Sequence, residues 1–373
     1  MQDLNREPPP IGISKTTENN FQLITKNLHS WIDSRKIVAK METTEPLKIY
    51  WGTATTGKPH LGYFVPIYKI ADFLKAGCHV TILFADLHGY LDNMKSDWEL
   101  LQHRCEYYKL VITEMLKFIG IDTSKLAFVR GSSYQLTEKY TLDMYRLSAH
   151  VTTEHTLKAG AEVVKQTENP AMSSLLYPML QALDEEYLDV DVQFGGIDQR
   201  KIFMFARERM PLIGYRKRAY LMNTLIPGLT SSGKMSSSEP NSKIDLDDSD
   251  ADIKRKIKKS FSIDGRVEGN GLLAILQHII FPRLEAENRE FVIPRQEKYG
   301  GPMSFKTFQQ VLDSFKLEKE DPNVLFSSDL KNALIIELQA LIGHMRYIIE
   351  QNKDLLDKAY SLPVKTKKKQ SKK

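Results

Sequence analysis

Several features are scarce or absent in this chain of 373 residues, and each absence excludes a class of protein. Its two cysteines, Cys78 and Cys105, are too few for a disulfide framework and lack the spacing of zinc ligands. No stretch approaches the roughly 18 uninterrupted apolar residues that a membrane span needs. The first twenty residues carry acids and no apolar segment, which argues against a secretory signal or a transit peptide. We therefore expect a soluble cytoplasmic protein without a membrane partner.

Charge is unevenly distributed along the chain. The formal net charge is +5, but residues 365–373 hold six lysines and no acid, and without them the charge is −1. The basic character therefore belongs largely to the end of the chain and does not by itself indicate a nucleic-acid partner. A disordered basic tail over 363–373 is favoured over a dedicated RNA-binding arm.

The order of hydrophobic patterns predicts an α/β protein. A flexible leader is expected over 1–20, and apolar residues from Phe21 to Ile32 recur at helical spacing, which indicates one amphipathic helix. Strands are then expected at 47–51, 79–84, 126–129, 189–194 and 219–222, alternating with helices at 63–75, 98–119, 137–188 and 199–210. This alternation predicts a Rossmann-like doubly wound parallel sheet with helices on both faces, over 21–245. Residues 246–362 lose the strand signal and should form a mainly helical second domain.

The loop after the first of these strands raises the question of phosphate binding. Residues Gly52 to Lys58 match the first part of a P-loop, G-x-x-x-x-G-K, but Pro59 stands where Ser or Thr must bind Mg²⁺. The P-loop interpretation therefore fails. What remains is a Gly-rich turn that leads through His60 into a helix, whose positive end offers free backbone donors. Alone, a histidine there is more typical of a helix cap than of a catalytic group.

A second motif changes the interpretation of His60. Residues 226–240 form a Gly- and Ser-rich segment, expected to be a mobile loop, with Lys234 and Met235 at its centre. Alone, it would fit a solvated loop or a phosphorylation site. Together with Pro-His-Leu-Gly at 59–62, it resembles the two signatures of the class I aminoacyl-tRNA synthetases. Tyr63 stands where the signature at the His60 turn ends in His, and Ser237 stands where the signature around Lys234 has its second Lys. Both departures resemble the tyrosine enzymes of eukaryotes and archaea.

Polar residues also gather on one helix stripe. Tyr177, Gln181 and Asp184 are spaced i, i+4, i+7, so they project from the same side of a helix, and Tyr50 is expected at the carboxyl end of a strand. Pro178 is expected in the first turn of that helix. The alternative to a binding site is a structural network in which these polar side chains satisfy one another's hydrogen bonds. The segment 195–200 adds a second polar cluster, in which Asp198 would cap a helix and Gln199 would point into the same cleft.

From residue 47 to residue 259 the chain resembles tyrosyl-tRNA synthetases of the eukaryotic cytoplasmic and archaeal type. The resemblance includes Gln-Phe-Gly-Gly-Ile-Asp-Gln-Arg at 193–200, and weaker likeness continues at 298–302 and 328–331. It implies activation of L-tyrosine by ATP with Mg²⁺, transfer to tRNA(Tyr), an anticodon-binding domain over 246–362, and a homodimer formed through an insertion near 130–180. An appended domain of animal members is expected to be absent. The alternatives are a tryptophanyl-tRNA synthetase and a catalytically inactive RNA-binding relative.

The resemblance also assigns roles to individual residues. The substrate phenol would be bound by Tyr50 and Asp184, its ammonium group by Tyr177, Gln181 and Gln199, and Asp86 and His88 would line the same pocket. His60 and Lys234 would be catalytic. The ATP site would comprise Gly52, Thr53, Pro59, His60, Gly62, Lys234, Met235, Ser236, Ser237 and Ser238. Contacts with tRNA would come from Arg200, Lys201, Tyr299 and Asp329, and no side-chain metal site is implied. The basic run 254–259, which follows several acids, is interpreted first as a surface helix and second as a nuclear-import or phosphate-binding segment.

Overall fold

The computed structural model describes residues 6–92, 97–164, 168–230, 235 and 240–360 of the chain. Six strands form the main sheet in the order β1-β6-β5-β2-β3-β4, and only β1 runs antiparallel to its neighbour. The strands are β1 (Leu28–Ile32), β2 (Lys48–Thr53), β3 (His79–Phe84), β4 (Leu126–Arg130), β5 (Val192–Gly196) and β6 (Ala219–Asn223). The predicted doubly wound parallel sheet is therefore confirmed.

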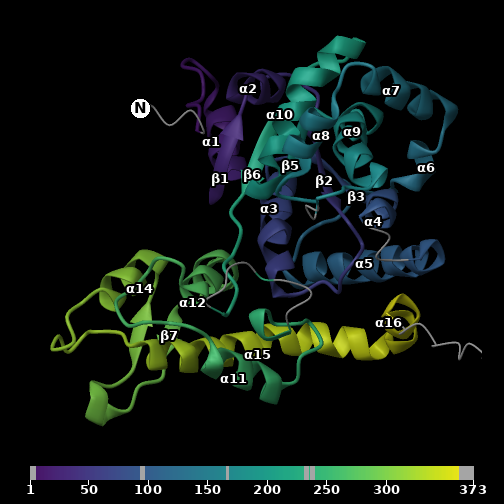
Figure 1. The fold of residues 1–373 in the computed structure, drawn as a ribbon. Helices are drawn as coiled ribbons and strands as arrows, with labels where there is room; N and C mark the ends of the chain where they lie inside the picture. The colour runs from purple at the N-terminus through teal and green to yellow at the C-terminus, as the bar shows by residue number, and fades with distance from the viewer. Residues whose placement is uncertain (1–5, 93–96, 165–167, 231–234, 236–239, 361–373) are drawn as a thin grey trace, which may run out of the picture.

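Side chains of the central strands alternate between two buried layers. Ile49 and Trp51 pack into the large core with α1, α3 and α5, whereas Tyr50 between them faces the opposite side of the sheet with Leu83. That opposite side is covered by α9 and α10, with α7 and α8 outside them (Figure 1). The helices of this part are α1 (Lys15–Thr25), α2 (Ser34–Met41), α3 (Phe64–Lys75), α4 (Asp86–Leu91), α5 (Trp98–Phe118), α6 (Ser132–Gln135), α7 (Glu138–Ser148), α8 (Thr153–Gly160), α9 (Met172–Tyr187) and α10 (Arg200–Arg209).

The second region is mainly helical, as expected. Its long helix α15 (Ser327–Gln351) lies beside α11 (Asp250–Lys259) and runs below the sheet domain to α16 (Lys353–Tyr360), which packs against α5 (Figure 1). A small antiparallel pair is formed by β7 (Phe291–Ile293) and β8 (Met303–Phe305). The remaining helical elements are α12 (Gly271–Ile275), the π-helical turn η5 (Leu276–Ile280), α13 (Phe281–Ala286), the 3₁₀ turn η6 (Glu297–Tyr299) and α14 (Phe308–Phe315).

The start of the chain corrects two sequence expectations. Helix α1 begins at Lys15, inside the segment expected to be a flexible leader, and Ser14 caps it by accepting a hydrogen bond from the Thr17 amide. The single helix expected over 21–32 is wrong, because α1 ends at Thr25 and 28–32 form β1. Within β1 the buried positions alternate with more exposed ones, a period of two that the helical spacing had masked.

Smaller differences concern the ends of elements. The strand expected at 189–194 begins at Val192, because Asp189 has a left-handed backbone with φ of 47°. In the helical region α14 begins only at Phe308, since Phe305 pairs with Phe291 in the small sheet. Pro178 lies inside α9 and not in its first turn. The expected basic tail, 363–373, lies outside the described residues.

Candidate active site

A cavity of about 450 Å³ opens at the carboxyl ends of the parallel strands, where ligands bind in sheets of this kind. It is lined from three directions: by the end of β2 and the loop that follows it, by one stripe of α9, and by the segment after β5. The predicted residues that line it are Tyr50, Gly52, Thr53, His60, Gly62, His88, Tyr177, Gln181, Asp184, Gln199 and Met235. The structure thus brings together segments that are far apart in sequence.

Asp184 lines this cavity and is completely buried. Its Oδ1 accepts hydrogen bonds from the Tyr134 hydroxyl at 2.8 Å, the Gln135 side-chain amide at 2.8 Å and the Tyr140 hydroxyl at 3.0 Å. Its Oδ2 has no hydrogen-bond partner among the described residues. Burial raises the pKa of Asp184 to about 7, while the three hydrogen bonds lower it. One oxygen of a buried acid that lines the cavity is therefore without a hydrogen-bond partner among the described residues.

Two further polar residues, Tyr50 and His88, interact with Asp184. The Tyr50 hydroxyl donates only a long hydrogen bond, 3.4 Å, to the carbonyl oxygen of Gln181, and burial followed by the charge of Asp184 raises the pKa of Tyr50. His88 Nε2 lies 3.8 Å from Asp184 Oδ2, and neither ring nitrogen has a hydrogen-bond partner among the described residues. Because burial lowers the pKa of His88 to about 3, the ring is neutral and this contact is not an ion pair.

The outer part of the cavity is also polar. Gln181 donates a hydrogen bond to the Gln199 side-chain oxygen at 3.1 Å, so Gln199 points into the cleft as expected. The Tyr177 ring packs edge-on against His88 with ring centroids 4.7 Å apart. Asp198, expected to cap α10, instead lies within the 3₁₀ turn η2 (Ile197–Gln199) and does not cap it.

Asp86 does not line the cavity, contrary to expectation. Its carboxylate accepts hydrogen bonds from the Ser132 amide at 2.9 Å, the Ser132 hydroxyl at 2.5 Å and the Leu87 amide at 2.8 Å. It therefore joins the end of β3 to the start of α6. An acid that follows a buried strand can either line a binding cavity or join two segments of the fold. Only its hydrogen-bond partners distinguish these two roles.

The loop after β2 holds His60 at the start of the 3₁₀ turn η1 (Leu61–Tyr63). His60 Nδ1 accepts a hydrogen bond from the Gly62 amide at 3.2 Å, so His60 does act as a cap. Burial, followed by the charge of Lys243, lowers the pKa of His60 to about 4. A Cβ added at Gly62 would lie 2.9 Å from the His60 ring, so glycine allows this close approach. Pro59, expected in the ATP site, is buried and does not line the cavity.

The Gly- and Ser-rich loop is described only in part. Lys234, Ser236, Ser237 and Ser238 lie outside the described residues, whereas Met235 lines the cavity next to Gly62. The segment after this loop is joined to the His60 turn, because the Leu61 amide donates to the Ile244 carbonyl oxygen at 2.9 Å. The two signature motifs are therefore neighbours in space.

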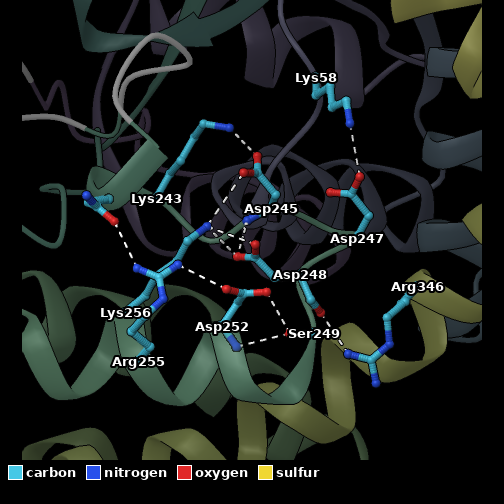
Figure 2. Close-up of polar contacts among 11 residues, drawn as sticks. Lys58, Lys243, Asp245, Asp247, Asp248, Ser249, Asp252, Arg255, Lys256 and Arg346 are labelled. Atoms are coloured by element: carbon cyan, nitrogen blue, oxygen red, sulfur yellow. Dashed lines mark hydrogen bonds and ion pairs between the residues drawn. The ribbon is translucent and has the colours of Figure 1, made fainter.

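An acidic segment, 245–250, connects this turn with the helical region (Figure 2). Lys58 pairs with Asp247 at 3.0 Å, and the buried Lys256 of α11 pairs with Asp248 at 2.6 Å. Arg346 of α15 donates to the Asp248 carbonyl oxygen at 2.7 Å. The expected surface helix over 254–259 is confirmed in α11, with the exception that Lys256 faces inward.

The four residues expected to contact tRNA lie in two places. Arg200 and Lys201 begin α10 beside the cavity; Arg200 Nη1 has no hydrogen-bond partner among the described residues, and Lys201 pairs with Glu162 at 2.9 Å. Tyr299 is 62% exposed in the helical region. The Asp329 carboxylate accepts a 3.4 Å hydrogen bond from the Phe326 amide at the start of α15.

Two kinds of site residue were missed from the sequence. Tyr134, Gln135 and Tyr140 hold Asp184 but lie 44 to 50 residues from it, so no local spacing could connect them. The buried Gln193 side chain also lines the cavity, next to Tyr50 across the sheet. Its position in a continuous buried strand did not indicate that its side chain lines a binding cavity.

Comparisons with known proteins agree with this geometry. A family model described as "tRNA synthetases class I (W and Y)" matches residues 41–338. The cytoplasmic tyrosine–tRNA ligase of Danio rerio is 52% identical over 96% of this chain and 66% of its own length. That of Saccharomyces cerevisiae is 48% identical over 95% of this chain and 90% of its own length. The chain spans 62–66% of the length of the vertebrate relatives it matches.

Solved structures are similar as well. Tyrosyl-tRNA synthetase of Archaeoglobus fulgidus, complexed with L-tyrosine, has a TM-score of 0.81 and 33% identity, covering 89% of this chain and 99% of that one. Tryptophanyl-tRNA synthetase of Giardia lamblia has a TM-score of 0.64 and 19% identity, covering 94% and 92%, and this likeness indicates the fold alone. None of the described helices is both long and apolar enough to span a membrane.

Proposed function

This chain belongs to the class I tRNA synthetases of the tryptophan and tyrosine group, and we propose that it is a tyrosine–tRNA ligase. In the proposed reaction, L-tyrosine and ATP form tyrosyl-adenylate and pyrophosphate, and the tyrosyl group then passes to the 3′ end of tRNA(Tyr). Relatives with about half of their residues identical are named tyrosine–tRNA ligases, and their names also support a cytoplasmic location. Residues 246–362 are the proposed anticodon-binding domain.

The observation that carries this proposal is that Asp184, whose Oδ2 has no hydrogen-bond partner among the described residues, lines the same cavity as Tyr50. A phenol hydroxyl donates one hydrogen bond and accepts another, so it would donate to Asp184 and accept from Tyr50. Phenylalanine would leave Oδ2 of the buried Asp184 without a partner and the Tyr50 hydroxyl with only its long hydrogen bond to the Gln181 carbonyl oxygen, and the unpartnered acid carries a large penalty. An indole has a single donor and no acceptor, so it would leave the Tyr50 hydroxyl with only its long hydrogen bond to the Gln181 carbonyl oxygen. This difference favours tyrosine over tryptophan as substrate.

The amino-acid end of the substrate would lie in the outer, polar part of the cavity. Tyr177, Gln181 and Gln199 are proposed to bind its ammonium group, and they already meet there through the Gln181–Gln199 hydrogen bond. The carboxylate of tyrosine is ionised at neutral pH, so it attacks the α-phosphorus of ATP without a general base. The work of the protein is then positioning and electrostatic stabilisation.

His60 is proposed to stabilise charge that develops on the phosphates. Its Nδ1 accepts from the Gly62 amide, so in the neutral ring Nε2 carries the proton and is a hydrogen-bond donor. Its lowered pKa, about 4, keeps this arrangement at neutral pH. Lys234 and the serines at 236–238 are proposed to close over the pyrophosphate. Gly52, Thr53 and Met235 would line the nucleotide site.

Mg²⁺ is proposed only as part of the nucleotide substrate. The described residues hold no group of three histidine, cysteine or acidic side chains that could bind a metal ion. Phosphate oxygens and water would be its ligands, which suits a small cation that keeps several waters. No step of the reaction is assigned to it here.

Contacts with tRNA and with a second copy of the chain are part of the same proposal. Arg200 and Lys201 would contact the acceptor end, and Tyr299 would stack on an anticodon base, which its exposure permits. Asp329 would accept a hydrogen bond from the base through Oδ1, since its contact with the Phe326 amide uses Oδ2. A homodimer through 130–180 is supported by exposed apolar side chains in that segment: Leu136, Leu142, Tyr145 and Met172.

The decisive experiment is ATP–pyrophosphate exchange with each of the twenty amino acids, followed by aminoacylation of tRNA(Tyr). Exchange that depends on tyrosine is expected. Exchange with tryptophan instead would favour the tryptophan enzyme, and no exchange with any amino acid would favour an inactive RNA-binding relative.

A further inference from the structure

Asp184 is held in an asymmetric way. All three hydrogen bonds to its carboxylate end on Oδ1, from Tyr134, Gln135 and Tyr140, at 2.8, 2.8 and 3.0 Å. Oδ2 has none among the described residues, although it is equally buried. Three donors on one oxygen prevent rotation of the carboxylate about its Cβ–Cγ bond, because rotation would exchange the bonded oxygen for the free one.

The three donors come from outside the helix that carries Asp184. Tyr134 and Gln135 lie on α6 and Tyr140 on α7, whereas Asp184 is on α9. The single hydroxyl proton of Tyr140 is shared between Asp184 Oδ1 at 3.0 Å and the Leu180 carbonyl oxygen at 2.9 Å, and both acceptors lie on α9. The Tyr134 and Tyr140 rings pack on each other and on Tyr187. The donors therefore belong to a packed aromatic cluster and are placed before any substrate binds.

We propose that Tyr134, Gln135 and Tyr140 are positioning residues for tyrosine selection, which fix Asp184 so that its Oδ2 alone faces the phenol hydroxyl. This inference rests on the proposed function. Without the three donors, the carboxylate would sample other orientations, and part of the hydrogen-bond energy would be spent on ordering it. With them, the only unsatisfied acceptor of this acid faces the cavity, where tyrosine satisfies it and phenylalanine does not.

The donors also affect the ionisation of Asp184. Burial raises the pKa of Asp184 to about 7, and the hydrogen bonds from Gln135, Tyr134 and Tyr140 oppose that rise. A protonated Asp184 would present a donor to the phenol and compete with its hydroxyl proton. Removal of a donor should therefore raise the pKa of Asp184 further. Tyrosine binding should then weaken at a higher pH on acidification than in the wild-type protein. The other titratable groups around Asp184 are Tyr50, Asp86, His88, Tyr177 and Glu185.

The experiment compares Tyr134→Phe and Gln135→Met with the control Tyr187→Phe. Tyr187 belongs to the same aromatic cluster, but its hydroxyl donates to Asp143 at 2.8 Å and not to Asp184. Pyrophosphate exchange is measured with tyrosine, with phenylalanine and as a function of ATP concentration. Each of the two test variants should lose about tenfold in the preference for tyrosine over phenylalanine, the size of a hydrogen bond to a charged group. The KM for ATP should not change, and Tyr187→Phe should keep the wild-type preference.

The pH dependence provides a second readout that a merely structural role would not move. The pH at which the KM for tyrosine begins to rise on acidification should lie higher in Tyr134→Phe and Gln135→Met than in wild type and Tyr187→Phe. Wild-type preference and an unshifted profile in both test variants would overturn the proposal. So would an equal loss with tyrosine, phenylalanine and ATP, which would mark the cluster as structural.

Asp184→Ala separates this inference from the proposed function. If Asp184→Ala loses the preference for tyrosine while Tyr134→Phe and Gln135→Met keep it, the positioning role is wrong and the proposed function stands. If the wild-type protein shows no exchange with tyrosine, the proposed function itself fails, and the inference with it.

Discussion

The backbone amide of Leu61 donates a 2.9 Å hydrogen bond to the carbonyl oxygen of Ile244, and the adjacent residues His60 and Asp245 form an antiparallel bridge. The turn that carries His60 is thus held by the segment that follows the Gly- and Ser-rich loop. That segment is in turn fixed by α11, through the pairing of Asp248 with the buried Lys256 (Figure 2). The geometry of His60 therefore depends on an ion pair outside the cavity.

Substitution Lys256→Met tests this dependence. It leaves the half-buried Asp248 without its charged partner at 2.6 Å, and loss of a hydrogen bond to a charged group typically costs about 2 kcal/mol of unfolding free energy. Burial already raises the pKa of Asp248, so loss of Lys256 should raise it further. We expect a lower midpoint of urea unfolding and a higher KM for ATP in pyrophosphate exchange. Lys254→Met, at an exposed position of the same helix, should change neither; equal behaviour of the two variants would contradict the linkage.

Substitution Lys234→Ala tests the role of the second signature. Met235 next to it lines the cavity beside Gly62, so the lysine belongs to a segment that reaches the proposed phosphate site. Loss of a charged group that acts on the transition state typically slows the reaction by about a hundredfold. We expect that loss in the rate of pyrophosphate exchange, with tyrosine binding, measured by calorimetry, nearly unchanged. An equal loss of both would show that the loop is structural.

Features of this molecule were predictable where the sequence pattern that indicates them lies within one short segment. Strand β3 was predicted from a continuous apolar run, because a strand buried on both faces needs no alternation. The stripe of Tyr177, Gln181 and Asp184 was predictable because helical spacing fixes which side chains share a face. Strand β1 was not predictable, since the apolar positions from Phe21 to Ile32 satisfy a helical period. In the structure Asn27, with φ of 61°, interrupts that helix before β1 begins.

Features that depend on distant partners could not be derived from the sequence alone. The carboxylate of Asp86 and that of Asp184 follow equally plausible patterns, but one binds Ser132 and the other faces the cavity. Which acid plays which role is decided by the packing of α6 against the sheet and α9. Pairings between far-separated residues, such as Lys256 with the acidic segment, likewise arise only when the two regions are assembled.

A buried carboxyl beside the site predicts an effect of pH on stability. Glu185 is 1% exposed, and burial raises its pKa to about 8, opposed by Arg218 and the Tyr220 hydroxyl. Because this folded-state pKa lies above the unfolded value of about 4.3, the folded protein binds the proton more tightly. Stability from this group is fully present below about pH 4 and is lost as the pH rises toward 8. Asp184 contributes in the same direction up to about pH 7.

We therefore expect Glu185→Gln to flatten the pH dependence of unfolding. The amide keeps the shape of the side chain and never carries the charge that burial disfavours. Relative to wild type, the variant should gain about 1 kcal/mol or more in unfolding free energy between about pH 5 and about pH 8, as measured by urea denaturation. The same pH slope in both proteins would mean that Glu185 does not titrate in this range.

The proposed dimer surface can be tested on the outer side of the helices that hold Asp184. Leu142 and Tyr145 of α7 are 58% and 68% exposed, and Leu136 after α6 is 61% exposed. Substitution Leu142→Glu places a charge in the proposed interface, where a central residue contributes about 2 kcal/mol or more, roughly thirtyfold in the dissociation constant of the dimer. We expect a shift toward monomer in sedimentation velocity. The matched control is Tyr347→Glu on α15, which is 60% exposed and lies outside the proposed interface.

The same experiment relates assembly to substrate choice. Helix α7 carries Leu142 on its exposed side and Tyr140, which binds Asp184 Oδ1, on its buried side. A partner that packs on the exposed side would restrain α7 and, through Tyr140, the orientation of the carboxylate. The monomeric Leu142→Glu protein should therefore discriminate less strongly between tyrosine and phenylalanine than the dimeric control does. If Leu142→Glu remains dimeric, residues 130–180 are not the interface; if it is monomeric but keeps full discrimination, α7 positions Asp184 without help from a partner.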